Sequence, residues 1–286
     1  MNDSPFTPPP APGPGPRGPG SIISRTFALY GHNLLHMVVI SATVTIPLIA
    51  AGLAAFGPGF MDIILGSPVG EDLHPLPASL LWPVAAYAAL YVLGIVAVTA
   101  AIAQAAATAL TGQPVSIGRA YSSALRRLPA IAGTSLLTGL AAGVPLTLAF
   151  LLGSSLSGPA TVLLFIVTLL VGVYLLVRLV FAPFAALLEQ AGPVAAMVKS
   201  WTLVSGMWLR TFAIFFLVTF LLGFVQLAFQ AFGALIPGME AFLTSLVVVP
   251  LTACADLLIY LDLRARKEGY SVDHMKTELE ALSGAA

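Results

Sequence analysis

The positively charged residues of this chain are confined to alternate connections between its apolar stretches. Six long apolar stretches are separated by five breaks, and the first, third and fifth breaks contain no Lys or Arg. The basic residues of the second and fourth breaks are Arg119, Arg126, Arg127, Lys199 and Arg210. Further basic residues precede the first stretch and follow the last. Because Lys- and Arg-rich connections stay cytoplasmic, the pattern predicts six membrane spans with both termini in the cytoplasm.

The composition agrees with residence in a lipid bilayer. Hydrophobic residues make up 58% of the chain and charged residues only 8%, whereas a soluble domain carries about 25% charged residues. We therefore expect the bilayer of a plasma membrane as the environment, with membrane or cytoplasmic proteins as further partners and the oligomeric state left open. Nucleic acid is not expected, because no extended basic face is present. The single cysteine, Cys254, excludes an intramolecular disulfide.

Each apolar stretch is long enough to cross a bilayer as a helix, which takes about 20 residues. The predicted spans are 34–56, 79–110, 129–153, 160–188, 211–236 and 241–263. The prolines expected to bend them are Pro47, Pro83, Pro145, Pro183 and Pro250. The small residues of the second span are Ala85, Ala89, Gly94, Ala97, Ala101 and Ala105. They predict a closely packed, central helix.

Three segments are expected along the chain. Residues 1–20 contain eight prolines and four glycines, which favours a disordered cytoplasmic tail, with a polyproline docking segment as the alternative. Residues 21–269 form the membrane domain, and residues 270–286 form a cytoplasmic tail. In the first outward loop, the apolar patch 60–65 is expected to dip into the outer interface.

A short pattern recurs before alternate spans: a basic residue, a small residue and an aromatic residue. The basic and aromatic members are Arg25 and Phe27, Arg119 and Tyr121, and Lys199 and Trp201. Aromatic rings favour the headgroup level, where a basic side chain reaches lipid phosphate. The fold class predicted is an all-α polytopic membrane bundle of three helical hairpins, each preceded by a short interfacial helix.

Two ionisable residues lie inside spans, at similar depth on the cytoplasmic side of the midplane. Arg178 can extend its guanidinium to the nearby interface, but the short side chain of Asp256 cannot. Since a charge within the bilayer is costly, we expect Asp256 to face the bundle interior and to pair with Arg178. A hydrogen-bonded or neutral carboxyl group and a proton- or ion-coupled transport site are the alternatives.

Other polar residues within the spans are Gln104, Gln226 and Gln230, for which interhelical hydrogen bonds or a polar substrate path are the two interpretations. His32 and His36 are spaced i,i+4 at the start of span 1, but no third ligand lies nearby. No metal or cofactor is therefore expected. No nucleophile elbow, phosphate loop or dinucleotide fingerprint occurs.

Two cytoplasmic junctions carry a family resemblance. The first runs from Pro183 through Glu189-Gln190-Ala191-Gly192-Pro193 and Lys199-Ser200-Trp201 to Gly206-Met207-Trp208-Leu209-Arg210. The second is Tyr260-Leu261-Asp262-Leu263-Arg264-Ala265-Arg266-Lys267-Glu268-Gly269. Together these resemble the membrane domain of bacterial glycerophosphoryl diester phosphodiesterases and its stand-alone relatives, over roughly residues 20–273. Span 6 should continue as a helix to Gly269, which places Asp262 and Arg266 at an i,i+4 spacing.

The resemblance does not extend to the enzyme. Catalysis in the fused relatives resembles that of a separate barrel, which needs about 250 residues, and only a short tail follows Gly269 here. We therefore expect a non-enzymatic scaffold or accessory subunit in envelope or lipid-related processes. The alternative is a small transporter or lipid-handling protein with a polar site near Asp256. A polar cavity reaching Asp256 would favour transport, and a closely packed bundle would favour scaffolding.

Overall fold

The structure, a computed structural model, describes residues 18–57, 78–154, 158–233 and 239–284. The predicted N-terminal tail, residues 1–20, therefore lies mostly outside the described residues, and the apolar patch 60–65 lies wholly outside them. The helices are α1 (Pro19–His32), α2 (Leu34–Phe56), α4 (Ala78–Leu110), α5 (Ile117–Ser154), α6 (Pro159–Leu179), α7 (Ala182–Leu188), α8 (Pro193–Val204), α9 (Trp208–Gly233), α10 (Met239–Leu243), the π-helix η1 (Thr244–Val248), α11 (Val249–Glu268) and α12 (Val272–Gly284). The described residues include no strand.

Six spans are confirmed. Within the described residues, six helical segments are long and apolar enough to cross a membrane, at the places that the sequence predicts. The fourth consists of α6 with α7, and the sixth of α10, η1 and α11. The protein is an all-α, multi-pass membrane protein.

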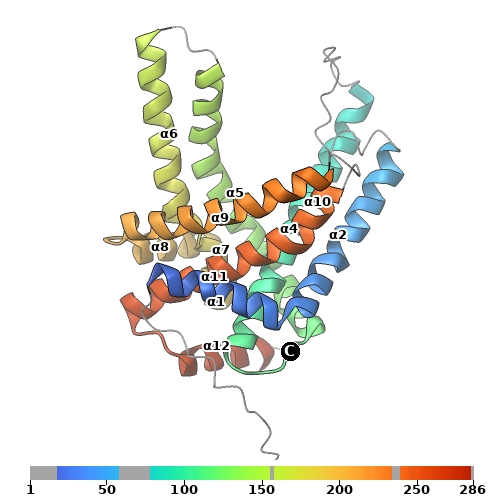
Figure 1. Cartoon of the computed structure of the whole chain (residues 1–286), viewed down its shortest axis with the longest axis vertical. Helices are drawn as coiled ribbons and strands as arrows, with labels where there is room; N and C mark the ends of the chain where they lie inside the picture. Colours follow the sequence, from blue (N-terminus) through green and yellow to red (C-terminus); the bar gives the residue numbers. More distant parts are fainter. Residues whose placement is uncertain (1–17, 58–77, 155–157, 234–238, 285–286) are drawn as a thin grey trace, which may run out of the picture.

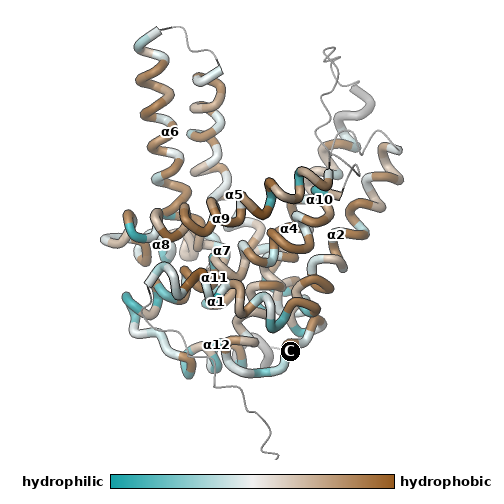
Figure 2. Tube along the Cα trace, viewed as in Figure 1, coloured by the Kyte–Doolittle hydropathy of each residue, from teal (hydrophilic) through white to brown (hydrophobic). Residues whose placement is uncertain are grey.

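The spans form three hairpins: α2 with α4, α5 with α6, and α9 with α10–η1–α11 (Figure 1). The α5–α6 hairpin stands apart from the rest, while α9 and α11 run across the view toward the α2–α4 hairpin. The unconnected ends of the hairpins lead into α1, the α4–α5 connection, α7–α8 and α12, a region we call the basic end. Hydrophobic residues line the long helices, and hydrophilic residues gather around α12 and at helix ends (Figure 2).

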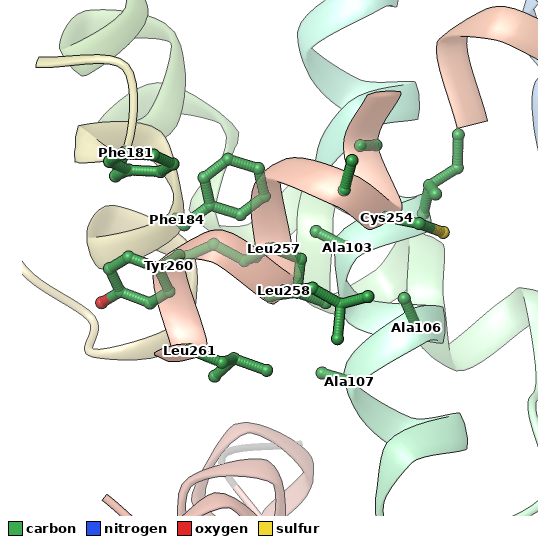
Figure 3. Packing of buried hydrophobic residues seen from close by; sticks show 14 of the residues in the cluster. Ala103, Ala106, Ala107, Phe181, Phe184, Cys254, Leu257, Leu258, Tyr260 and Leu261 are labelled. Carbon is green, nitrogen blue, oxygen red and sulfur yellow. The ribbon is translucent and has the colours of Figure 1, made fainter. Parts of the chain in front are cut away.

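The core lies where α11 crosses α4 and α7 (Figure 3). Ala103, Ala106 and Ala107 of α4 present a small-residue surface against which Leu257 and Leu258 of α11 pack. Helices in lipid associate through such close van der Waals packing. On the other side of α11, α7 is buried along most of its length.

The prediction that span 2 is central is correct for only half of α4. Ala97, Ala101 and Ala105 are buried, whereas Ala85 and Ala89, farther from the basic end, are exposed. Between them, Gly94 is partly buried and packs closely against Val44 and Leu48 of α2. Residues 84–89 in the first turns of α4 have the same small-residue composition but are largely exposed.

Two prolines break the helices that contain them. Pro183 has no N–H to donate to the carbonyl of Leu179, and the fourth span ends one helix at Leu179 before α7 begins. Pro250 likewise leaves the carbonyl of Leu246 without its helical donor. The chain forms the π-helix η1 there, and the Tyr30 hydroxyl donates to the Leu246 carbonyl at 3.3 Å.

The three interfacial helices are not alike. α1 ends at His32 and α8 ends at Val204, so both are distinct from the spans that follow. The middle copy of the repeat instead lies in the first turns of α5, which continues without interruption from Ile117 into span 3. α1 lies against α11 through a buried face of Ile22, Thr26 and Tyr30.

Candidate functional site

Charged side chains of distant segments meet at the basic end, beginning with Lys199 of α8. Its ammonium lies 2.8 Å from a Glu189 carboxylate oxygen and 2.5 Å from one of Glu268. Glu189 ends α7 and Glu268 ends α11, so this lysine joins three helices. Burial lowers the pKa of Lys199, but hydrogen bonds to both carboxylates and their negative charges outweigh it, and the net pKa is raised.

Arg264 of α11 extends this cluster to α12. Its guanidinium binds Glu278 through two hydrogen bonds of 2.8 and 3.0 Å and contacts Glu268 at 3.1 Å. It also lies 3.7 Å from the ring centroid of Tyr270, whose hydroxyl donates to Glu278 at 2.6 Å. Burial and the neighbouring Glu278 raise the pKa of Tyr270. A bidentate, stacked guanidinium is fixed in direction as well as in charge.

Glu189 completes the link between these two centres. Its carboxylate accepts a hydrogen bond from the Tyr260 hydroxyl and lies 3.4 Å from Arg264. We call Glu189, Lys199, Arg264, Glu268 and Glu278 the charged cluster. The side chain of Arg264 is only 7% exposed, whereas those of its partners Glu268 and Glu278 are 32% and 25% exposed.

The prediction that α11 continues to Gly269 with an Asp262–Arg266 pair is confirmed. Arg266 lies 3.0 Å from Asp262, and Gly269 ends the helix at φ +64°. Asp262 is nevertheless 1% exposed rather than a surface residue, and it also binds Arg210 of α9 at 2.7 Å. This second charge centre attaches α9 to the end of α11.

The structure corrects the predicted Arg178–Asp256 pair. The Arg178 guanidinium donates to the Tyr174 hydroxyl at 3.1 Å and to the Trp201 carbonyl at 3.0 Å, and it stacks 4.6 Å from a Trp201 ring centroid. Ser200 donates to the Arg178 carbonyl at 2.7 Å. Arg178 therefore joins α6 to α8, while the half-buried Asp256 makes no ion pair or hydrogen bond within the described chain.

The repeat residues have different roles from those predicted. Phe27 and Trp201 are exposed as expected of interfacial aromatics, but Tyr121 is partly buried and donates to the Ile40 carbonyl of α2 at 2.6 Å. Lys199 binds carboxylates instead of extending toward lipid phosphate. Arg119 is exposed.

Arg25, the basic residue of the first copy, is half-buried on α1. His32 and His36 do not share a helix face, because α1 ends before α2 begins. The Nδ1 atom of His32 lies 2.7 Å from the Ala28 carbonyl oxygen. No group of metal-binding side chains occurs among the described residues.

The glutamines do not form the predicted interhelical hydrogen bonds. Gln226 and Gln230 are exposed on α9, and neither forms a side-chain hydrogen bond within the described residues. Gln104 is 6% exposed, and its Oε1 has no partner. It lines a small pocket of about 160 Å³ at the basic end, together with Thr108 and Arg119.

A larger cavity of about 620 Å³ lies away from the basic end, between the α2–α4 hairpin and the α9–α10–η1 segment. Its apolar wall includes Leu48 and Val98, and its polar lining includes Tyr87, Gln226 and Glu240. Asp256 lines neither this cavity nor the smaller pocket.

Sequence reasoning missed several of these residues. Glu278 and Tyr270 reach Arg264 only because the chain turns at Gly269, so their spacing follows no helical period. Tyr30 is paired with a carbonyl 216 residues away. Pro250 indicates that the carbonyl of Leu246, four residues earlier, needs another hydrogen-bond donor. The sequence does not indicate that Tyr30 is that donor.

No family model, no curated protein and no solved structure matches the chain. The class of the protein, a multi-pass all-α membrane protein, therefore rests on its own helices. The resemblance to phosphodiesterase membrane domains stays a prediction.

Proposed function

We propose that the protein is a non-enzymatic scaffold or accessory subunit of the bacterial plasma membrane, with its basic end and both termini in the cytoplasm. The charged cluster carries the proposal. Its cations and carboxylates bind one another and hold the α7–α8 junction, α11 and α12 together. A catalytic site instead needs an acid, base or nucleophile that can reach a substrate.

The two motifs behind the family resemblance support this interpretation. Glu189 and Lys199 come from the first motif, and Arg264 and Glu268 come from the second. All four lie in the charged cluster. In this chain the motifs therefore maintain the shape of the basic end. The resemblance favours a role in envelope or lipid-related processes, exerted through partner proteins.

The surface offered to such a partner is the outer face of α12. Met275 and Leu279 are buried beneath the helix, whereas Asp273, His274 and Lys276 are exposed. A helix with a buried apolar face and a polar outer face is held in place by the molecule below it. The partner we propose is a protein with a polar, charge-complementary surface.

The alternative function, transport at Asp256, has less support. A transport site needs a water-filled path to the ionisable group, and neither described cavity is lined by Asp256. The helix around Asp256 is instead buried against α4 and α7.

Photo-crosslinking in cells tests the scaffold. A photoreactive phenylalanine analogue at Lys276 should give a discrete protein adduct, whereas the same analogue at Leu170, an exposed residue of α6, should give only lipid adducts. Arg264→Gln should weaken the Lys276 adduct, because α12 loses its attachment. The Leu170 adducts should not change.

Two results would overturn the proposal. One is an adduct at Lys276 that is no different from that at Leu170. The other is hydrolysis of a glycerophosphodiester by the purified chain in nanodiscs, at a rate that depends on residues of the charged cluster. Either result would replace the scaffold with a lipid-exposed or an enzymatic basic end.

A further inference from the structure

The cavity of about 620 Å³ between the α2–α4 hairpin and the α9–α10–η1 segment is independent of the charged cluster. Ligand pockets in proteins measure about 300–1,000 Å³ and combine an apolar wall with a few polar groups. This cavity has both properties. Tyr91 and Ile95 line it and are 42% and 38% exposed on α4, so it opens sideways toward the bilayer.

A carboxylate at the cavity has no counter-ion among the described residues. Glu240 is partly buried and lines the cavity, but it makes no ion pair or hydrogen bond within the described residues. It lies against Gly233, where an added Cβ would come within 3.3 Å of Glu240 Oε2. Gly233 is the C-terminal residue of α9, and the negative end of a helix dipole favours a cation.

Two tyrosine rings, those of Tyr87 and Tyr91, line the same space, and Phe56 packs beside them. Tyr87 and Tyr91 stack at 6.4 Å between centroids, and Phe56 meets Tyr87 edge-on at 5.7 Å. The Tyr87 hydroxyl donates to the Leu48 carbonyl at 3.2 Å, which holds its ring in place. The faces of aromatic rings attract organic cations.

The π-helix supplies an unsatisfied polar group. Thr244, the first residue of η1, lines the cavity, and its hydroxyl is buried without a hydrogen-bond partner in the part of the chain that the structure describes. Buried hydroxyl groups are normally hydrogen-bonded, and π-helical turns occur often at functional sites. A ligand in the cavity would satisfy this group.

From these four observations we propose that the cavity binds a hydrophobic monovalent cation, such as an amine with an apolar body, taken up sideways from the bilayer. The described lining contains no Lys, Arg or His, so an anionic ligand would find no counter-charge. This inference goes beyond the scaffold role and does not depend on it.

Radiolabelled tetraphenylphosphonium is a suitable probe, because tetraphenylborate has nearly the same shape and the opposite charge. The full-length protein in nanodiscs should bind tetraphenylphosphonium saturably, above the partition into empty nanodiscs. Unlabelled tetraphenylborate should not compete at the same site. Equal competition by both ions, or no saturable binding, would overturn the proposal.

Variants separate the contributions of charge and shape. Glu240→Gln should weaken binding at least tenfold, whereas Asp273→Asn, at an exposed carboxylate of α12, should leave it unchanged. Tyr91→Leu should weaken binding severalfold. Ala88→Phe, which adds a ring to the cavity lining, should abolish it.

The thermal unfolding midpoint of each variant shows whether it is folded. Glu240 has a rival role, because it lies in the first turn of α10, where a carboxylate stabilises the helix N-terminus. A Glu240→Gln variant that loses stability but keeps its affinity would assign Glu240 to this role and overturn the ligand site.

Discussion

At the scale of single residues, the role of a charged side chain follows from the groups that it contacts and not from its depth in the membrane span. Arg178 and Asp256 occupy similar positions along their helices, yet Arg178 binds Tyr174 and Trp201 on its own side of the molecule. Depth along a span follows from counting residues. The direction of a side chain depends on helix rotation, which neighbouring helices determine.

Arg264 should be the most sensitive cation. Arg264→Met leaves Glu189, Glu268 and Glu278 without their shared guanidinium. We expect a loss of about 3 kcal/mol, at the lower end for a broken buried pair, because Glu268 and Glu278 are 32% and 25% exposed. The free energy of unfolding of Arg264→Lys should lie between those of the unchanged protein and Arg264→Met, since an ammonium cannot bind bidentately. Thermal unfolding in detergent measures both, with Arg119→Met as the exposed control. Equal midpoints for Arg264→Met and Arg119→Met would refute this.

Arg178→Ala and Asp256→Ala should have additive effects. The two residues share no contact, and changes at unconnected sites add within about 0.5 kcal/mol. The free energies of unfolding of the two single variants and the double variant in the same detergent give the coupling. If the double variant recovered stability relative to the sum, the two groups would interact after all.

At the scale of elements, Pro183 and Pro250 lie where spans depart from a regular α-helix, whereas Pro47, Pro83 and Pro145 lie inside continuous helices. Pro250 leads to the π-helix η1, and Tyr30 of α1 donates to the carbonyl of Leu246. α1 is therefore an internal support of span 6 in addition to an interfacial helix. The sequence predicts the bend, but the partner comes from the far end of the chain.

Tyr30→Phe should weaken the attachment of α1 to the sixth span. The loss of one hydrogen bond predicts a decrease of about 0.5–1.5 kcal/mol in the free energy of unfolding. Hydrogen exchange at α1 should rise as well. Tyr91→Phe is the matched control, because the Tyr91 hydroxyl has no hydrogen bond among the described residues. Identical exchange in the two variants would show that the Leu246 contact contributes nothing.

At the scale of the whole molecule, the three hairpins meet at the basic end, and away from it the α5–α6 hairpin separates from the other two (Figure 1). The half at the basic end contains the alanine surface of α4, the buried α7 and the charged cluster. The other half contains exposed apolar residues, together with the larger cavity where the α2–α4 hairpin meets the α9–α10–η1 segment. The first half therefore suits a fixed assembly surface, and the second suits contact with lipid and ligands.

Reporter fusions test the orientation of the molecule. Because basic residues occur only at one end, fusions at Gly112 and at the C-terminus should report the cytoplasm, and fusions at Gly70 and Gly238 should report the outside. Alkaline phosphatase and green fluorescent protein give opposite signals for the two sides. A cytoplasmic signal at Gly238 would contradict the third hairpin.

The sequence by itself determined the number and approximate positions of the spans, the helical end at Gly269 and the i,i+4 pair of Asp262 with Arg266. These properties depend on local composition, because lipid requires every backbone group to be satisfied within its own helix. Only the tertiary structure decided that Lys199 meets Glu189 and Glu268, and that Glu240 faces a cavity. In a bilayer, apolar helices pack almost equally well in several rotations. The partner of each polar side chain is therefore chosen by the close packing of the whole bundle.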